Sequence, residues 1–122
     1  MSVPLDRVVQ FVTGAQHLVE THRPQGRLYA FGHVGDGNIH TAVFLGPDEG
    51  EDLQAVCADL YAKMDELVWS FGGSICAEHG VGVENVDRLS GQKSSLELEM
   101  MRRIKSLFDP EGRMNPGKLI SG

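Results

Sequence analysis

The sequence has little positive charge and no long apolar run. Its 122 residues contain 11 Lys and Arg against 17 Asp and Glu, so the formal net charge is −6. A nucleic-acid-binding domain normally carries a basic face, so this balance argues against nucleic acid as a partner. No apolar stretch approaches the roughly 18–20 residues that cross a bilayer, so we expect no membrane span. The length predicts a single globular domain over residues 1–122.

Cysteine is also scarce. The two cysteines, Cys57 and Cys76, are too few for a disulfide framework, and their spacing is not that of a CxxC site. Unpaired thiols are typical of a reducing compartment, so we expect a cytoplasmic location. Cys57 occurs on the apolar stripe of a predicted helix, and we interpret it as a packing residue.

Three segments have the apolar spacing of amphipathic helices, at residues 4–21, 50–71 and 94–108. Ser94 and Glu97 fit a capping box at the start of the third. Between the first two, residues 27–45 have the pattern of two strands, and residues 72–82 that of a short extended segment and a loop. This order predicts an α+β fold, with a small antiparallel sheet and helices packed on one face.

Glycine is abundant, with 15 residues, and clusters near the polar motifs. Asp36 and Gly37 lie between two apolar runs, which is a strong signal for a hairpin with a type I′ turn. With these two residues at the centre of the turn, His33 pairs with His40 across the strands. The turn chemistry therefore predicts that the two imidazoles lie side by side.

Histidines and acids occur in two glycine-rich stretches, GHVGDGNIH (32–40) and AEHGVG (77–82). His33 and His40 could offer two imidazoles to one divalent cation, and Glu78 could add a carboxylate. Two histidines and one carboxylate are a common catalytic metal set. Each residue also has a simpler explanation, since a strand histidine is often a packing residue and a lone Glu is often solvated. Spacing alone leaves both interpretations open.

Four motifs in order span residues 32–118. They are GHVGDGNIH (32–40), SICAEHGVG (74–82), MMRRIKSLFDP (100–110) and MNPGK (114–118). Together they resemble the C-terminal domain of FAD-linked oxidoreductases of the vanillyl-alcohol-oxidase type. The branch they resemble is the group of the glycolate oxidase FAD subunit, D-lactate dehydrogenase and D-2-hydroxyglutarate dehydrogenase. The fold that this implies is the ferredoxin-like half of the substrate domain.

The resemblance implies oxidation of a D-2-hydroxy acid to the 2-oxo acid, with hydride passing to FAD. It also implies roles for six residues: His33, His40 and Glu78 bind a divalent metal, His79 is the general base, Asn38 contacts the substrate and Asn115 lies close to the flavin. Two imidazoles and a carboxylate do not discriminate between Zn, Mn and Fe.

The resemblance includes no counterpart of the FAD-binding domain. We therefore expect the chain to be the C-terminal part of a larger flavoenzyme, inactive alone because FAD is bound mainly elsewhere. The expected partners are a small 2-hydroxy acid, an FAD-binding domain or subunit, and a second copy of the chain, since unpaired sheet edges and apolar patches tend to be covered.

Two other functions are compatible with the same residues. In a small metal-dependent hydrolase, Glu78 or His79 would activate a metal-bound water. In a non-catalytic α+β interaction module, the glycines and histidines would serve only turns and packing. The motif MNPGK (114–118) has no role in the hydrolase, so the sequence favours the flavoenzyme.

Overall fold

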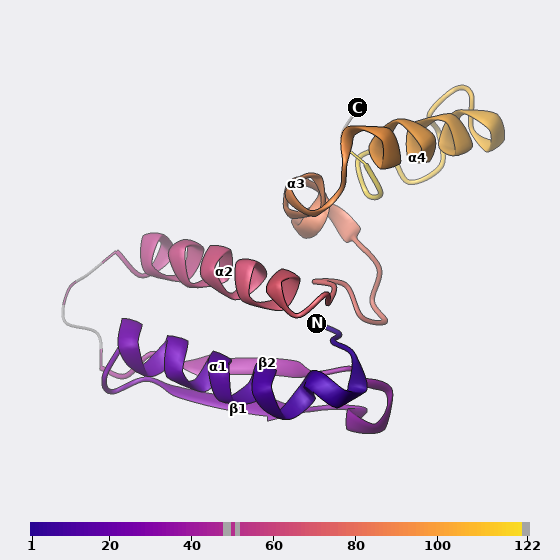
Figure 1. The fold of residues 1–122 in the computed structure, drawn as a ribbon. Coiled ribbons are helices and arrows are strands. Elements are labelled where there is room, and N and C mark those ends of the chain that lie inside the picture. The colour runs from indigo at the N-terminus through magenta and orange to yellow at the C-terminus, as the bar shows by residue number, and fades with distance from the viewer. Residues whose placement is uncertain (48–49, 51, 121–122) are drawn as a thin grey trace. The chain divides into compact units, whose positions relative to one another are not determined.

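The computed structural model describes residues 1–47, 50 and 52–120, and it divides into two compact units, Met1–Ala77 and Glu78–Gly122 (Figure 1). Each unit has its own helices, and the units are described separately below. None of the helices in the described residues combines the length and the apolar character needed to cross a membrane.

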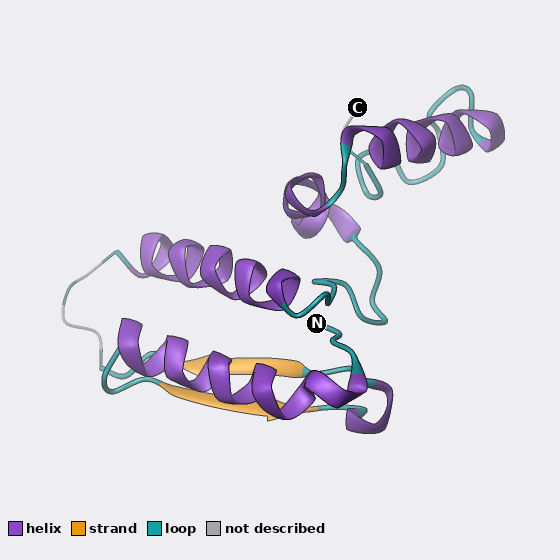
Figure 2. Cartoon of the chain, in the orientation of Figure 1, coloured by secondary structure: helices purple, strands orange, loops and turns teal. Residues whose placement is uncertain are grey.

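The first unit is built from two helices and a two-stranded sheet. Its elements in chain order are the 3-10 turn η1 (Leu5–Arg7), α1 (Val8–His22), β1 (Arg27–Phe31), the 3-10 turn η2 (Val34–Asp36), β2 (His40–Phe44) and α2 (Leu53–Ser70). The strands are antiparallel, and α1 contacts both the sheet and α2 (Figure 2). This confirms the predicted α+β class.

The core of the first unit lies between α1 and α2. Helix α1 buries Phe11, Ala15 and Val19 at the spacing of one helical face. Val68 of α2 is fully buried as well, and Phe11 meets Phe71 in an edge-to-face contact with ring centroids 6.0 Å apart. Burial of such side chains contributes about 1.5–3 kcal/mol each, so this cluster is the main source of stability in the unit.

The two faces of the sheet differ in burial. Leu28 and Val43 are cross-strand partners, and both pack against the core. Three aromatic side chains alternate with them on the opposite face, where each is more than half exposed: Tyr29, Phe31 and Phe44. Within the first unit, the helices therefore pack on the face of the sheet that carries Leu28 and Val43, as predicted.

The predicted tight hairpin is wrong. His40 pairs with Phe31, not with His33, and the strands are joined by the eight residues 32–39. A type I′ turn needs positive φ at both central residues, but Asp36 lies in η2 and only Gly37 adopts the left-handed conformation, with φ 70°. Asp36 and Asn38 both donate their backbone N–H groups to the carbonyl of His33. The loop is therefore a 3-10 turn closed by a glycine.

The N-terminal segment explains why the tight turn does not form. Ser2 forms isolated β-bridges with Asn38 on one side and with Ser74 on the other. The N–H of Val3 donates to the carbonyl of Gly37 at 3.0 Å, and the N–H of Ile39 donates to the carbonyl of Met1 at 2.9 Å. Residues 37–39 therefore pair with the N-terminal segment, and they cannot also close a two-residue hairpin.

The second unit contains α3 (Gly82–Gln92) and α4 (Ser95–Phe108). The predicted capping box is confirmed, because Ser94 accepts from the N–H of Glu97 while the Glu97 carboxylate accepts from the N–H of Ser94. These bonds with Ser94, together with Lys93, lower the pKa of Glu97 to about 2. The sequence patterns did not predict α3, which buries Val86 and Leu89.

The predicted apolar face of α4 is present but not buried within the described part of the second unit. Four of its side chains are more than half exposed: Met100, Ile104, Leu107 and Phe108. Monomeric proteins rarely expose contiguous apolar surface of this kind, so the face is suited to association.

Gly37 and Gly35 provide a matched pair for testing the loop. A Cβ on Gly37 would lie 2.1 Å from the carbonyl oxygen of Val3, in a left-handed backbone, whereas a Cβ on Gly35 meets nothing within 4 Å. We expect Gly37→Ala to lower the free energy of unfolding by at least about 1–2 kcal/mol, the cost of the left-handed conformation alone. Gly35→Ala should stay within about 0.5 kcal/mol of the parent. Urea unfolding measures both, and equal effects would contradict the observed loop conformation.

Candidate functional site

His33 and Asn38 lie at the two ends of the 3-10 loop and face each other. The Asn38 Nδ2 atom is 3.4 Å from the His33 Nδ1 atom. Asn38 is only 6% exposed, whereas His33 is exposed. A buried amide therefore holds one ring nitrogen of an imidazole whose other side faces outward.

His40 is the first residue of β2 and lies on the aromatic face of the sheet. Its ring stacks on the ring of its cross-strand partner Phe31, with centroids 5.6 Å apart and an interplanar angle of 27°. The side chain is half-buried. The stacking orients the imidazole of His40, and Phe31 is a contributor that the sequence patterns did not identify.

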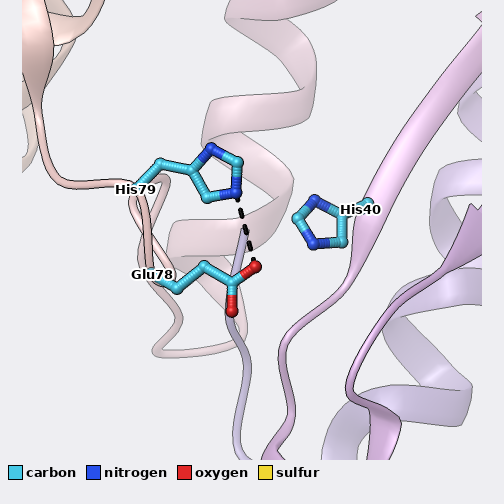
Figure 3. Close-up of side chains that lie close together, drawn as sticks. All are labelled: His40, Glu78 and His79. Atoms are coloured by element: carbon cyan, nitrogen blue, oxygen red, sulfur yellow. Dashed lines mark ion pairs between the residues drawn. The ribbon is translucent and has the colours of Figure 1, made fainter.

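Glu78 and His79 form an ion pair in the second unit, in the segment before α3. The Glu78 Oε1 atom lies 3.3 Å from the His79 Nε2 atom (Figure 3). Figure 3 also draws His40, which belongs to the first unit. The side chain of His79 is 75% exposed and that of Glu78 is 41% exposed. The carboxylate and imidazole of adjacent residues thus meet at a surface that solvent reaches.

Asn115 lies in the turn-rich tail that follows α4. It is exposed and has a positive φ of 47°, and its carbonyl accepts from the N–H of Lys118 at 3.3 Å. Among non-glycine residues, Asn is one of the few that adopts this conformation readily. Asn115 is therefore an exposed residue that opens a tight turn over residues 115–118.

The tail is held by Asp109, a buried carboxylate at the end of α4. Its oxygens accept from the backbone N–H groups of Arg113 and Met114, both at 2.8 Å, and from the Lys105 ammonium. Lys105 also donates to the carbonyl of Met114 at 2.6 Å. The bond from Lys105, and then those from Met114 and Arg113, hold the pKa of Asp109 below its ordinary value. The sequence indicated only that Asp109-Pro110 ends the helix.

The structure groups the candidate residues in pairs. It brings Asn38 to His33, Phe31 to His40, and Glu78 to His79. It does not make His33 the cross-strand partner of His40. Of these residues, His33, Asn38 and His40 belong to the first unit, whereas Glu78, His79 and Asn115 belong to the second.

Comparison with known proteins places the chain in one family, and its relatives there have related names. The model of the family described as FAD linked oxidases, C-terminal domain, matches residues 1–119. The chain is 38% identical over 123 residues to a D-2-hydroxyglutarate dehydrogenase of Stutzerimonas stutzeri (strain A1501), a match that covers 99% of this chain and 26% of that protein.

Two further relatives are named for related chemistry. The chain is 40% identical over 89 residues to the glycolate oxidase subunit GlcD of Escherichia coli (strain K12), covering 72% of this chain and 17% of that subunit. It is 34% identical over 121 residues to a D-lactate dehydrogenase of Anaerostipes hadrus, covering 96% of this chain and 24% of that enzyme. The chain thus spans about a quarter or less of the length of these relatives.

Asp109 should control the order of the tail. In Asp109→Ala, we expect the backbone amides of Arg113 and Met114 to exchange with solvent roughly tenfold faster or more, because both lose a charge-assisted hydrogen bond. Glu111→Ala is the matched control. Glu111 is an acidic residue of the same segment, but it pairs with the exposed guanidinium of Arg113 and not with the backbone amides that are measured. Hydrogen exchange followed by NMR measures both variants.

The same measurement has a defined pH dependence. Since the pKa of Asp109 is lowered in the folded chain, its contribution is fully present above the ordinary carboxyl pKa and is lost as pH falls through the lowered value. Protection of the two amides that is independent of pH down to strong acid would contradict this role.

Proposed function

This chain belongs to the FAD-linked oxidases, whose C-terminal domain it represents, and we propose that it supplies the substrate- and metal-binding part of an enzyme that oxidises a D-2-hydroxy acid to the 2-oxo acid. The observation that carries the proposal is that three relatives are named for D-2-hydroxyglutarate, D-lactate and glycolate, which are all 2-hydroxy acids. In this proposal FAD would be held mainly by a separate domain or subunit and would supply the hydride acceptor for the oxidation.

The chemistry of three candidate side chains suits a divalent cation. His33 and His40 supply two imidazoles, each held by a neighbour, and Glu78 supplies a carboxylate. This donor set suits Zn, Mn or Fe and leaves coordination positions for a substrate. We propose these three residues as the ligands. A bound cation would act as a Lewis acid toward the substrate hydroxyl.

His79 is proposed as the general base that takes the hydroxyl proton. It is exposed, so a substrate can reach it, and it lies beside a carboxylate. After the proton is taken, the imidazolium faces the Glu78 carboxylate at close range, which compensates the charge that forms. A positioned histidine contributes about 10²–10⁴-fold to such a proton transfer.

The two asparagines complete the proposed site. Asn115 is proposed to contact the flavin, and its exposure directly after the segment held by Asp109 is consistent with that role. Contact of Asn38 with the substrate stays a prediction. Association with an FAD-binding domain or with a second copy of the chain, and a cytoplasmic location, likewise stay predictions.

Metal content tests the ligand assignment directly. We expect the chain, purified without chelators, to hold close to one equivalent of metal, and His33→Ala/His40→Ala to hold almost none, because two of the three ligands are removed. His17→Ala/His22→Ala is the matched control, since it removes two histidines of α1 that lie outside the motifs. Equal metal content in the parent and the His33/His40 variant would contradict the assignment.

The role of His79 is tested in the complete flavoenzyme. We expect His79→Gln to lower turnover of a D-2-hydroxy acid by about 10²–10⁴-fold, because the base is lost, while the metal content stays unchanged. His17→Gln should leave both quantities unchanged. Loss of metal from His79→Gln would identify His79 as a ligand, and activity without flavin would favour a hydrolase.

A further inference from the structure

Asn38 is held by its backbone on both sides, and its side-chain amide is buried. Its backbone is held on both sides, because its N–H donates to the carbonyl of His33 at 3.2 Å and the residue forms a β-bridge with Ser2. Its amide is buried, with Nδ2 at 3.4 Å from the Nδ1 atom of His33. Its Oδ1 atom is also buried and has no hydrogen-bond partner among the described residues.

The amide orientation determines which nitrogen of His33 carries the proton. When Asn38 Nδ2 donates to Nδ1, the neutral ring must carry its proton on Nε2. The opposite orientation would direct Oδ1 at the ring and require the proton on Nδ1. It would also leave two amide N–H groups buried at the position that Oδ1 now occupies. Orphaned N–H groups are rarer than under-satisfied carbonyls, so the observed orientation is favoured without metal.

This preference would be reversed if His33 held a cation through Nε2. Metal binding needs the lone pair of Nε2, so the ring proton must move to Nδ1, which then becomes a donor. Asn38 can accept that proton's hydrogen bond if its amide turns by half a rotation and presents Oδ1. No net proton leaves the ring, and the shape of the buried side chain is unchanged. Because an amide both donates and accepts, Asn38 can serve His33 in either state.

We propose that Asn38 is a positioning residue, whose buried amide sets the tautomer and orientation of His33 so that Nε2 is presented to the metal. This inference rests on the proposed function, in which His33 is a metal ligand. It differs from direct contact of Asn38 with the substrate, because Asn38 acts through the imidazole. A hydrogen-bond partner on the second nitrogen is the usual arrangement for a metal-binding histidine.

The tautomer can be measured on the parent chain without any substitution. Two-bond ¹H–¹⁵N correlations at about pH 8, where an ordinary imidazole is neutral, distinguish the two ring nitrogens. We expect His33 to carry its proton on Nε2 without metal and on Nδ1 after Zn²⁺ is added, with a change in the Asn38 side-chain amide signals. Retention of one tautomer in both states would overturn the proposal.

Variants test whether the effect on metal passes through His33. We expect Asn38→Leu, of similar volume, to weaken Zn²⁺ binding by about 10–100-fold in competition with a chelator. In the His33→Ala background, Asn38→Leu should cause no further loss, since the two residues act as one unit. Gly35→Ala, in the same loop and with open space around its Cβ, should bind Zn²⁺ like the parent.

Asn38→Asp serves as the conservative variant. Its ionised carboxylate can only accept, so it should fix the Nδ1–H tautomer of His33 without metal and retain Zn²⁺ binding. An equal loss of Zn²⁺ affinity for Asn38→Leu with and without His33 would overturn the proposal, because Asn38 would then act by another route.

Failure of the proposed function gives a different result. In that case Zn²⁺ affinity does not change in His33→Ala. The tautomer of His33 in the metal-free parent and in metal-free Asn38→Leu still shows whether Asn38 determines which ring nitrogen carries the proton. A different tautomer in the two chains supports the positioning role, and the same tautomer overturns it.

Discussion

The pairing of residues 1–3 with two distant segments is the constraint on which the first unit depends. Ser2 exchanges backbone hydrogen bonds with Ser74 at 2.8 Å in both directions, and its other side bridges to Asn38. The approach is so close that a Cβ on Gly73 would lie 2.3 Å from the carbonyl oxygen of Ser2. Val3, Ile39 and Ile75 are all buried at this junction. The loop before β2 and the segment after α2 are thus held by the same short stretch of backbone.

This constraint shapes the candidate site. Because Gly37 and Ile39 use their backbone groups to bind residues 1–3, the chain crosses between the strands by a 3-10 turn and not by a tight hairpin. His33 then stands at the start of the loop and His40 at the start of β2, where Phe31 stacks against it. The same pairing buries Asn38 behind His33. The contacts that orient the two histidines therefore depend on the pairing with residues 1–3 and on the strand register. The residues of the turn alone do not determine them.

The sequence predicted those parts of the fold that local patterns control. The apolar stripe of α1 and the reciprocal bonds of Ser94 and Glu97 act within a few residues, so spacing was sufficient to find them. The prediction of a tight turn at Asp36-Gly37 was wrong because a weak local preference competed with the long-range hydrogen bonds that Gly37 and Ile39 make with residues 1–3. Helix α3 was not predicted because its sequence is polar on average, begins with Gly82 and has Gly91 as its second-last residue.

The candidate site shows the same division between local and long-range information. The motifs identified which residues carry donor atoms, because residue type and order are enough for that purpose. They did not identify Phe31 or Asp109 as the partners that orient His40 and the tail. These partners are ordinary residue types in strand and helix-end positions, and their roles arise only when the register and the tail turn are known.

The histidines of the first unit and the Glu78–His79 pair differ in the kind of contact that orients them, and the difference has a physical consequence. The imidazoles of His33 and His40 are ordered by a buried amide and by ring stacking, so little side-chain entropy is lost when either binds a ligand. Glu78 and His79, by contrast, meet at an exposed surface, where an ion pair contributes about 0–1 kcal/mol and is readily exchanged.

The buried Oδ1 of Asn38 is a departure from a structure optimised for stability alone. Leaving a buried acceptor without a partner costs about 1–3 kcal/mol, and an apolar side chain of the same shape would avoid that cost. Its neighbour Ile39 is 1% exposed and belongs to a core that includes Phe11 and Val68, so the unit has the packing energy to offset the loss. Departures of this kind are expected at functional sites, where an interaction is kept for what it does to a neighbour. Here the neighbour is the imidazole of His33, whose Nδ1 atom lies 3.4 Å from the buried amide.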